Sequence, residues 1–161
     1  MQKRIYFDAQ GWYKGGALTL DEILKIQMFG EFSISNKYYN MVSTTSNSMQ
    51  VQMLLSYLIA NKDTKVSKQK LMEILWPGDT CNKPAGALRN LVYRARKEMA
   101  NFFPDGSEDC IMLVQNAYVW NPQTPCQIDI YEFEMYCNLA QREENPAKRY
   151  EYSQKALDLY K

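Results

Sequence analysis

The chain has 161 residues, 46% of them hydrophobic and 23% charged, which excludes a disordered protein and allows a core that folds without metal ions or disulfide bonds. Histidine is absent and no two of the four cysteines form a Cys-x-x-Cys pair, so we expect neither a metal site nor a cofactor. The formal net charge of +1 indicates no particular partner, and no signal peptide or long apolar run is present, so we expect a cytoplasmic protein without membrane contact.

The N-terminal part of the chain is expected to begin irregularly and to continue as short strands. Residues 1–24 mix aromatic residues with glycines and are interpreted as an arm or linker, with one helical turn at 20–24 because Thr19 and Glu22 have the spacing of a capping box. Apolar and polar residues then alternate, which is typical of antiparallel strands with one buried face. We expect strands at about 25–29, 31–36 and 38–43.

Three amphipathic helices follow, at about 47–61, 67–76 and 84–102. Ser67 is a good N-cap for the second helix, and Pro84 suits the first turn of the third. In each helix the apolar residues recur at three- and four-residue spacing, which predicts one buried stripe. The stripe residues are Val51, Leu54, Leu55, Leu58 and Ile59 in the first helix, Leu71, Ile74 and Leu75 in the second, and Leu88, Leu91, Val92, Ala95, Met99 and Phe102 in the third.

A β-hairpin and two further helices are expected in the remaining sequence. The hairpin strands, 111–113 and 118–120, flank a turn at 115–117. One helix is expected from Asp129, with a turn at 143–146 and a second helix over about 150–160. The helical pattern runs to the last residue, so we interpret 127–161 as a truncated helical segment.

Two helices with a sharp Pro-Gly break between them, followed by a β-hairpin, indicate a winged helix-turn-helix. The expected fold class is therefore α+β, a winged helix-turn-helix followed by a helical hairpin. The expected organisation is an arm over 1–24, a winged-helix DNA-binding domain over 25–122 and the helical segment over 127–161.

Charge is distributed unevenly along the chain. Residues 61–97 contain nine basic and three acidic residues, a net charge of +6, whereas 105–161 contain five basic and ten acidic residues, a net charge of −5. A basic central segment of this kind suits a polyanion such as nucleic acid. The alternative, a solvated surface on which charges are scattered, stays open at this point.

The third predicted helix presents long polar side chains away from its apolar stripe. A helix enters the major groove when one face packs on the domain and the other is polar and long-reaching. Asn90 suits adenine and Arg94 suits guanine or a phosphate, so these are the candidate base-reading residues. The candidate phosphate contacts are Lys65, Lys68, Lys70, Arg89, Tyr93, Arg96 and Lys97, of which Arg96 points toward one flank. An ordinary solvated helix face explains the same residues about equally well.

The tip of the predicted hairpin carries Gln115 and Asn116. These side chains form hydrogen bonds but bring no charge, whereas a wing that enters the minor groove usually offers Arg or Lys. We interpret the tip as a plain β-turn that supplies polar side chains at most.

In sequence order, these segments resemble the OmpR-type winged-helix domains of SARP-like transcription regulators. KVSKQKLMEILWPGD resembles the second helix of that family, ALRNLVYRARKEM its recognition helix, IQMFGEFSI its first strands and LVQNAYVWN its wing. IDIYEFEMYCNLA resembles the start of the bacterial transcriptional activator domain. Two departures are Ala117, where glycine is usual, and the absence of the customary wing arginine.

The resemblance implies a bacterial transcription regulator that binds double-stranded DNA, with Asn90 and Arg94 at the base-reading positions. Such domains often occur in two-component signalling, after a receiver domain. The implied protein partners are RNA polymerase, a receiver or helical-repeat domain of a longer protein, and a second copy on DNA.

The sequence leaves two other functional classes to consider. One is a winged-helix protein–protein interaction module that has lost DNA binding, which the acidic C-terminal third and the uncharged wing favour. The other is an enzyme, which we do not expect because the sequence has no histidine, no phosphate-binding glycine loop and no nucleophile motif.

Overall fold

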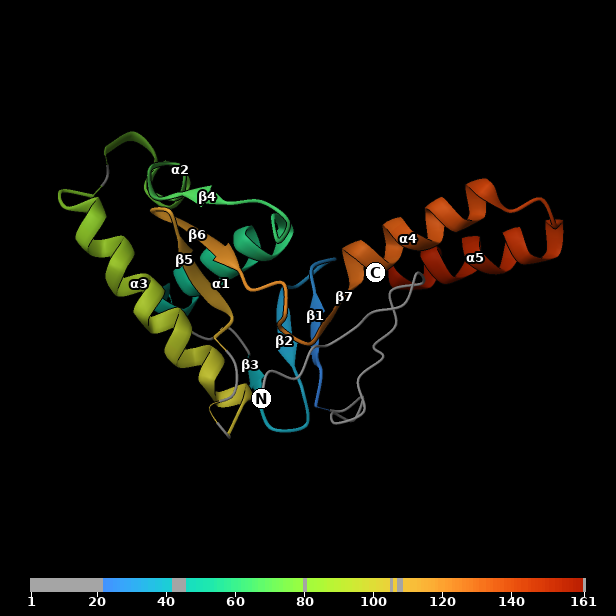
Figure 1. The fold of residues 1–161 in the computed structure, drawn as a ribbon, viewed down its shortest axis with the longest axis horizontal. Helices are drawn as coiled ribbons and strands as arrows, with labels where there is room; N and C mark the ends of the chain where they lie inside the picture. The colour runs from blue at the N-terminus through green and yellow to red at the C-terminus, as the bar shows by residue number, and fades with distance from the viewer. Residues whose placement is uncertain (1–21, 42–45, 80, 105, 107–108, 161) are drawn as a thin grey trace. The chain divides into compact units, whose positions relative to one another are not determined.

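The structure is a computed structural model that describes residues 22–41, 46–79, 81–104, 106 and 109–160. It divides into two compact units, shown together in Figure 1. Residues 38–124 form the three-helix unit. Residues 1–37 and 125–161 form the helical-hairpin unit.

The three-helix unit is built on α1 (Ser46–Ala60), α2 (Lys68–Leu75) and α3 (Pro84–Met99), with the two-residue strand β3 (Asn40–Met41) before them. Each helix packs against the other two. The side chains of the predicted α1 stripe are all buried, as are Leu71 and Leu75 of α2 and every stripe residue of α3. The period of the sequence therefore predicted these helices and most of their core residues correctly, but Ile74, also predicted as buried, is only half-buried.

Local signals also set the helix ends. The Ser67 hydroxyl accepts a hydrogen bond from the Lys70 amide at 3.1 Å, which confirms the predicted N-cap of α2. After α2, a 3₁₀ turn (Pro77–Asp79) contains Gly78 in the left-handed conformation, with φ of 68°. The α-helix α3 ends at Met99, three residues earlier than predicted, and a second 3₁₀ turn (Ala100–Phe102) follows it.

Tyr39 packs against the C-terminal end of α3. Its hydroxyl donates to the Glu98 carboxylate at 2.7 Å, and its ring packs edge-on against Phe102 at a centroid distance of 5.0 Å. The hydrogen bond to Glu98 raises the pKa of Tyr39, and burial adds to the effect. Tyr39 thus joins the segment before α1 to the C-terminal end of α3.

A three-stranded sheet completes this unit, in the order β4 (Val66–Ser67), β6 (Ala117–Trp120), β5 (Ile111–Val114). β5 and β6 form an antiparallel hairpin in which Val114 is opposite Ala117. Only Gln115 and Asn116 lie between the strands, with φ of 49° and 65°. Two residues with positive φ make the tight type I′ turn that matches the twist of a hairpin.

Because glycine adopts positive φ more easily than asparagine, we expect Asn116→Gly to stabilise the three-helix unit, by about 0.5 kcal/mol. Asn116→Val should destabilise it by about 1–2 kcal/mol, since a β-branched residue is strained at this φ. Urea denaturation followed by circular dichroism measures both. Equal midpoints for the two variants would contradict the assigned turn.

The helical-hairpin unit contains a sheet in the order β2 (Ser33–Ser35), β1 (Leu24–Gln27), β7 (Cys126–Ile128). β1 pairs antiparallel with β2 and parallel with β7, so residues about 100 positions apart in the sequence lie side by side. α4 (Asp129–Arg142) and α5 (Pro146–Leu159) pack on each other as a helical hairpin (Figure 1). The Asn145 side chain caps α5 by accepting from the Ala147 and Lys148 amides.

Asp129 connects the sheet of this unit to α4. Its carboxylate accepts from the Met28 amide at 2.8 Å, from the Phe29 amide at 2.9 Å and from the Ile130 amide at 2.8 Å. The Phe29 ring in turn packs edge-on against Phe133 of α4 and Tyr160, at centroid distances of 5.4 and 5.2 Å. One carboxylate and one aromatic ring therefore hold the turn after β1 against the helical hairpin.

Several predicted boundaries need correction. The helical turn expected at 20–24 does not form over the described residues, because Leu24 begins β1 and pairs with Cys126. Ile23 and Leu24 are fully buried rather than part of an irregular arm. β7 was not predicted, and α5 begins at Pro146 rather than near 150. Residues 1–21 and 42–45, including parts of the predicted arm and third strand, lie outside the described residues.

Candidate nucleic-acid interface

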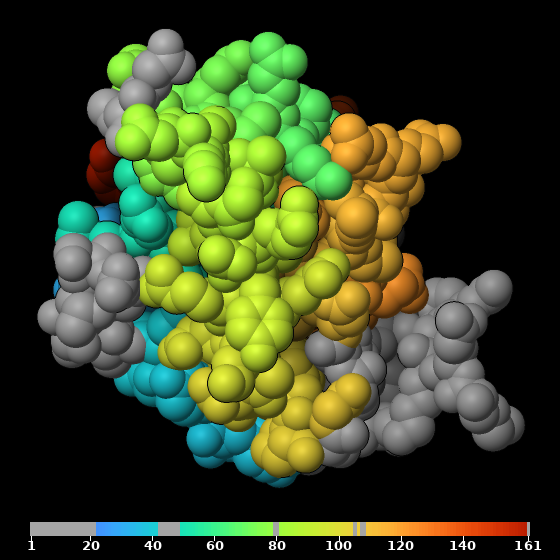
Figure 2. Space-filling view, turned by 90° about the vertical axis from the view of Figure 1, so that its left-hand side faces the viewer, coloured from blue at the N-terminus to red at the C-terminus, as the bar shows by residue number. Residues whose placement is uncertain are grey.

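α3 has one buried and one exposed face. Leu88, Leu91, Val92, Ala95 and Met99 are at most 2% exposed. The side opposite this stripe is open to solvent, and Figure 2 shows it facing the viewer, with the β5–β6 hairpin along one side and α2 at its upper end. The long side chains exposed on this side include Arg89, Asn90, Tyr93 and Lys97, and Tyr93 is 64% exposed.

The other two candidates on α3 lie at the flanks of this exposed face. Arg94 is half-buried and makes an interaction inside the protein. Arg96 donates from Nε and Nη2 to the Ile111 carbonyl oxygen of β5, at 3.1 and 2.7 Å, and its Nε lies 3.6 Å from Asp109. Arg96 therefore fixes the hairpin to α3, a structural role that the sequence did not predict.

The candidate lysines lie beside the hairpin, where Lys65 directly precedes β4, and on α2. Lys65 Nζ donates to Gln115 Oε1 of the turn at 2.8 Å. Lys68 Nζ lies 5.8 Å from the centre of the Tyr118 ring, within range of a cation–π interaction, and Lys70 is exposed in the first turn of α2. Asn116, like Gln115, is exposed at the tip.

The three-helix unit thus brings most of the candidate residues onto α3, α2 and the hairpin. Arg89 and Lys97 give the exposed α3 face positive charge, and Asn90 offers an amide that donates and accepts. A face of this composition, 16 residues long and backed by a rigid core, can contact base edges and phosphates together.

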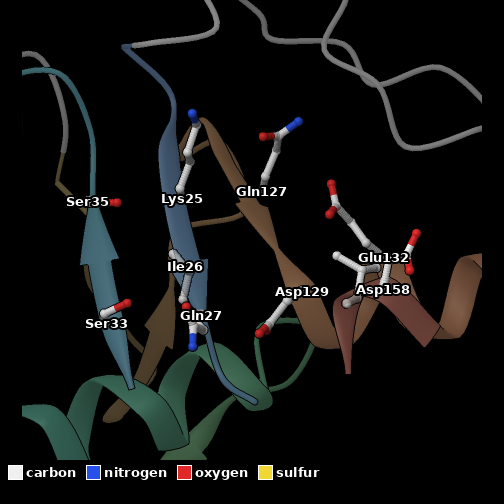
Figure 3. Close-up of a pocket in the computed structure, with 10 residues that line it drawn as sticks. Lys25, Ile26, Gln27, Ser33, Ser35, Gln127, Asp129, Glu132 and Asp158 are labelled. Atoms are coloured by element: carbon white, nitrogen blue, oxygen red, sulfur yellow. The ribbon is translucent and has the colours of Figure 1, made fainter. Parts of the chain in front are cut away.

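The helical-hairpin unit contains a pocket that sequence reasoning did not find. It has a volume of about 340 Å³, and Lys25, Gln27, Ser33, Ser35 and Gln127 of the three strands line it together with Asp129, Glu132 and Asp158 (Figure 3). These residues come from five elements and share no local motif. Burial raises the pKa of Glu132, and the nearby Asp129 carboxylate adds to the rise.

The raised pKa of Glu132 has a consequence for stability. A carboxyl group whose pKa is higher in the folded state contributes stability below its unfolded pKa, about 4.3, and loses it as pH rises through the folded pKa. We therefore expect Glu132→Gln, which removes the charge, to raise the melting temperature relative to the native protein more at pH 7 than at pH 3.5. Thermal melts at the two pH values measure this difference. A constant difference would show that ionisation of Glu132 does not oppose folding.

None of the described helices has the length and apolar character needed to span a membrane.

Comparison with known proteins finds a likeness among solved structures. No family model and no curated protein matches the sequence. Among solved structures, the chain is similar to Mycobacterium tuberculosis EmbR in complex with a low-affinity phosphopeptide, with a TM-score of 0.62 and 18% identity. The match covers 85% of this chain and 35% of the EmbR chain, so this chain spans about a third of the length of EmbR.

At this identity the likeness concerns the fold alone. It shows that this chain shares its fold with part of the EmbR chain. The mixed α+β architecture described above is compatible with a winged helix, in which α2 and α3 form the helix-turn-helix and β5–β6 the wing.

Proposed function

We propose that this chain binds double-stranded DNA in a sequence-specific manner, as part of a transcription regulator of the SARP or OmpR type, with α3 in the major groove. The observation that carries the proposal is the outer face of α3, where Arg89, Asn90, Tyr93 and Lys97 are exposed while the opposite face is core. This is the arrangement that major-groove binding requires.

The site residues take the following proposed roles. Asn90 reads a base edge, because its amide can pair with adenine and its position on α3 is exposed. Arg89 and Lys97 contact phosphates on either side of the groove. Arg94 reads a base only if its half-buried side chain is released from its internal interaction.

The remaining parts of the proposal rest on the sequence resemblance. They are a DNA-binding domain over 25–122 that acts in the cytoplasm, RNA polymerase and a receiver or helical-repeat domain as protein partners, and a dimer on DNA. The likeness to EmbR is consistent with a regulator of this kind through its fold. An enzymatic function is not part of the proposal.

Binding of the chain to a mixed-sequence duplex, measured by fluorescence anisotropy at 50 and 200 mM salt, tests the proposal. If about four phosphates are contacted, affinity should fall by roughly 150-fold between these concentrations. Selection of bound sequences from a random duplex pool should then yield a preferred site. No binding at 50 mM salt would overturn the proposal.

A protein–protein interaction module is the second candidate function. Two candidate DNA contacts, Arg96 and Lys65, already make hydrogen bonds within the protein, and the exposed side chains Tyr93 and Leu113 suit a protein partner as well. This alternative is preferred if Arg89 and Lys97 prove dispensable for DNA binding, or if no duplex is bound.

A further inference from the structure

The tip of the β5–β6 hairpin consists of two residues without charge. Gln115 and Asn116 make the whole loop, and both are exposed. The flanking residues, Val114 and Ala117, are apolar and begin the paired strands. The two residues of the loop therefore carry no charge of their own.

The positive charge of this region comes from lysines beside the hairpin, directly before β4 and at the start of α2. Lys65, directly before β4, donates to Gln115 Oε1 at 2.8 Å. Lys68 lies over the Tyr118 ring, and Tyr118 pairs with Val66 of β4. Because a lysine ammonium has three donors, Lys65 keeps two N–H groups for a further acceptor while Gln115 holds its position.

These charges suit a phosphate better than a base edge. The narrow minor groove has a strongly negative potential that attracts inserted Arg or Lys, so two loop residues without charge of their own gain little by entering it. Phosphates lie along the rim of the groove, where an exposed ammonium fixed by one hydrogen bond forms a charge-assisted contact.

We propose that the hairpin and Lys65 together bind a backbone phosphate, that Gln115 is the positioning residue for Lys65, and that the chain reads DNA sequence through the major groove alone. The inference rests on the proposed function and specifies which part of the chain recognises the DNA sequence. It assigns all sequence discrimination to α3 and only affinity to the hairpin.

The first arm of the test changes the minor groove of the selected duplex and leaves its major groove intact. Inosine in place of guanine removes the amino group from the minor-groove edge, and diaminopurine in place of adenine adds one, whereas the major-groove edges of both pairs are unchanged. We expect the Kd of the chain to change less than twofold over every substituted position. A loss of affinity of fivefold or more at any position beside the α3 site would overturn the inference.

The second arm compares Lys65→Ala, Gln115→Ala and the double variant. Lys65→Ala should weaken binding about fivefold on selected and unselected duplexes alike, and lower the salt slope by about one. Gln115→Ala should weaken binding less, and the double variant should bind no worse than Lys65→Ala, because Gln115 acts through Lys65. Lys148→Ala, on α5, is the matched control for loss of one exposed positive charge.

The outcomes separate the two proposals. Additive losses in the double variant, or a change of the selected sequence in Lys65→Ala, would overturn the role of the hairpin while DNA binding stands. Failure of the native chain to bind any duplex would overturn both the proposed function and this inference.

Discussion

Replacing Arg89 and Lys97 together by alanine should weaken binding of the selected duplex about 30-fold at 150 mM salt. Both side chains are exposed on the outer face of α3, and neither is needed for its core stripe. A charge-assisted contact to phosphate is worth about 1 kcal/mol when it is partly screened, and the two contacts lie far enough apart to add. The slope of log affinity against log salt should also fall by about 1.8, since two fewer counterions are released.

The control for this double variant is Lys148→Ala with Arg149→Ala. These residues lie on the exposed surface of α5, in the helical-hairpin unit, and their replacement removes the same charge. We expect a much smaller change in affinity and in salt slope. Circular dichroism before titration verifies that alanine, a strong helix former, leaves α3 intact.

An unchanged affinity in the Arg89 and Lys97 double variant would remove α3 from the DNA interface. The exposed face of α3 would then be free to meet a protein, and the interaction-module candidate would follow. Equal losses in the α3 and α5 variants would instead show that binding depends on net charge rather than on the α3 face.

The sequence was a good guide wherever structure is local. The helical stripes of α1, α2 and α3 repeat every three to four residues, so all of their predicted core residues except Ile74 could be named without coordinates. The Ser67 cap and the Pro-Gly break after α2 are local signals too. Asn145 followed by Pro146 was an equally clear helix start, and it was missed.

Contacts between segments far apart in the chain left no local signal in the sequence. β7 has three residues, and what makes it a strand is its parallel register with β1, about 100 positions away. The side chain of Asp129 was interpreted as part of a helix start, whereas most of its hydrogen bonds go to amides after β1. A pattern confined to neighbouring residues cannot show a partner of this kind.

In the candidate site too, local patterns were predictable from the sequence and long-range contacts were not. The period of α3 predicted which residues face outward near the centre of the polar side, such as Asn90 and Lys97. At the edges of that side, tertiary contacts decide whether a side chain is available. Arg96 meets β5 there, and its guanidinium is occupied by the Ile111 carbonyl, which only the placement of the hairpin reveals.

Asp129→Ala should lower the free energy of unfolding of the helical-hairpin unit by about 3 kcal/mol. The carboxylate accepts hydrogen bonds from three part-buried backbone amides, and each donor left without an acceptor costs about 1 kcal/mol or more. The variant also removes a negative charge from the first turn of α4, where it favours the helix. For a chain of this size the melting temperature should fall by about 10 °C.

Two further variants serve as comparisons for the loss of unfolding free energy in Asp129→Ala. Asp129→Asn keeps one acceptor oxygen and loses the charge, so it should cost about half as much. Asp158→Ala removes an exposed carboxylate of α5, which accepts a hydrogen bond from Gln154 at 3.2 Å. This variant should lower the free energy of unfolding by less than about 0.5 kcal/mol. Urea denaturation gives the three free energies on one scale.

Hydrogen exchange shows which part of the chain loses stability in Asp129→Ala. In the native chain the Met28 and Phe29 amides should be protected, because the Asp129 carboxylate holds both. In Asp129→Ala their protection should disappear before that of α3. If both amides stay protected in the variant, another acceptor replaces the carboxylate, and Asp129 is not what holds the turn after β1 to α4. If α3 loses protection to the same extent, the two units unfold together, and Asp129 stabilises the three-helix unit as well as its own unit.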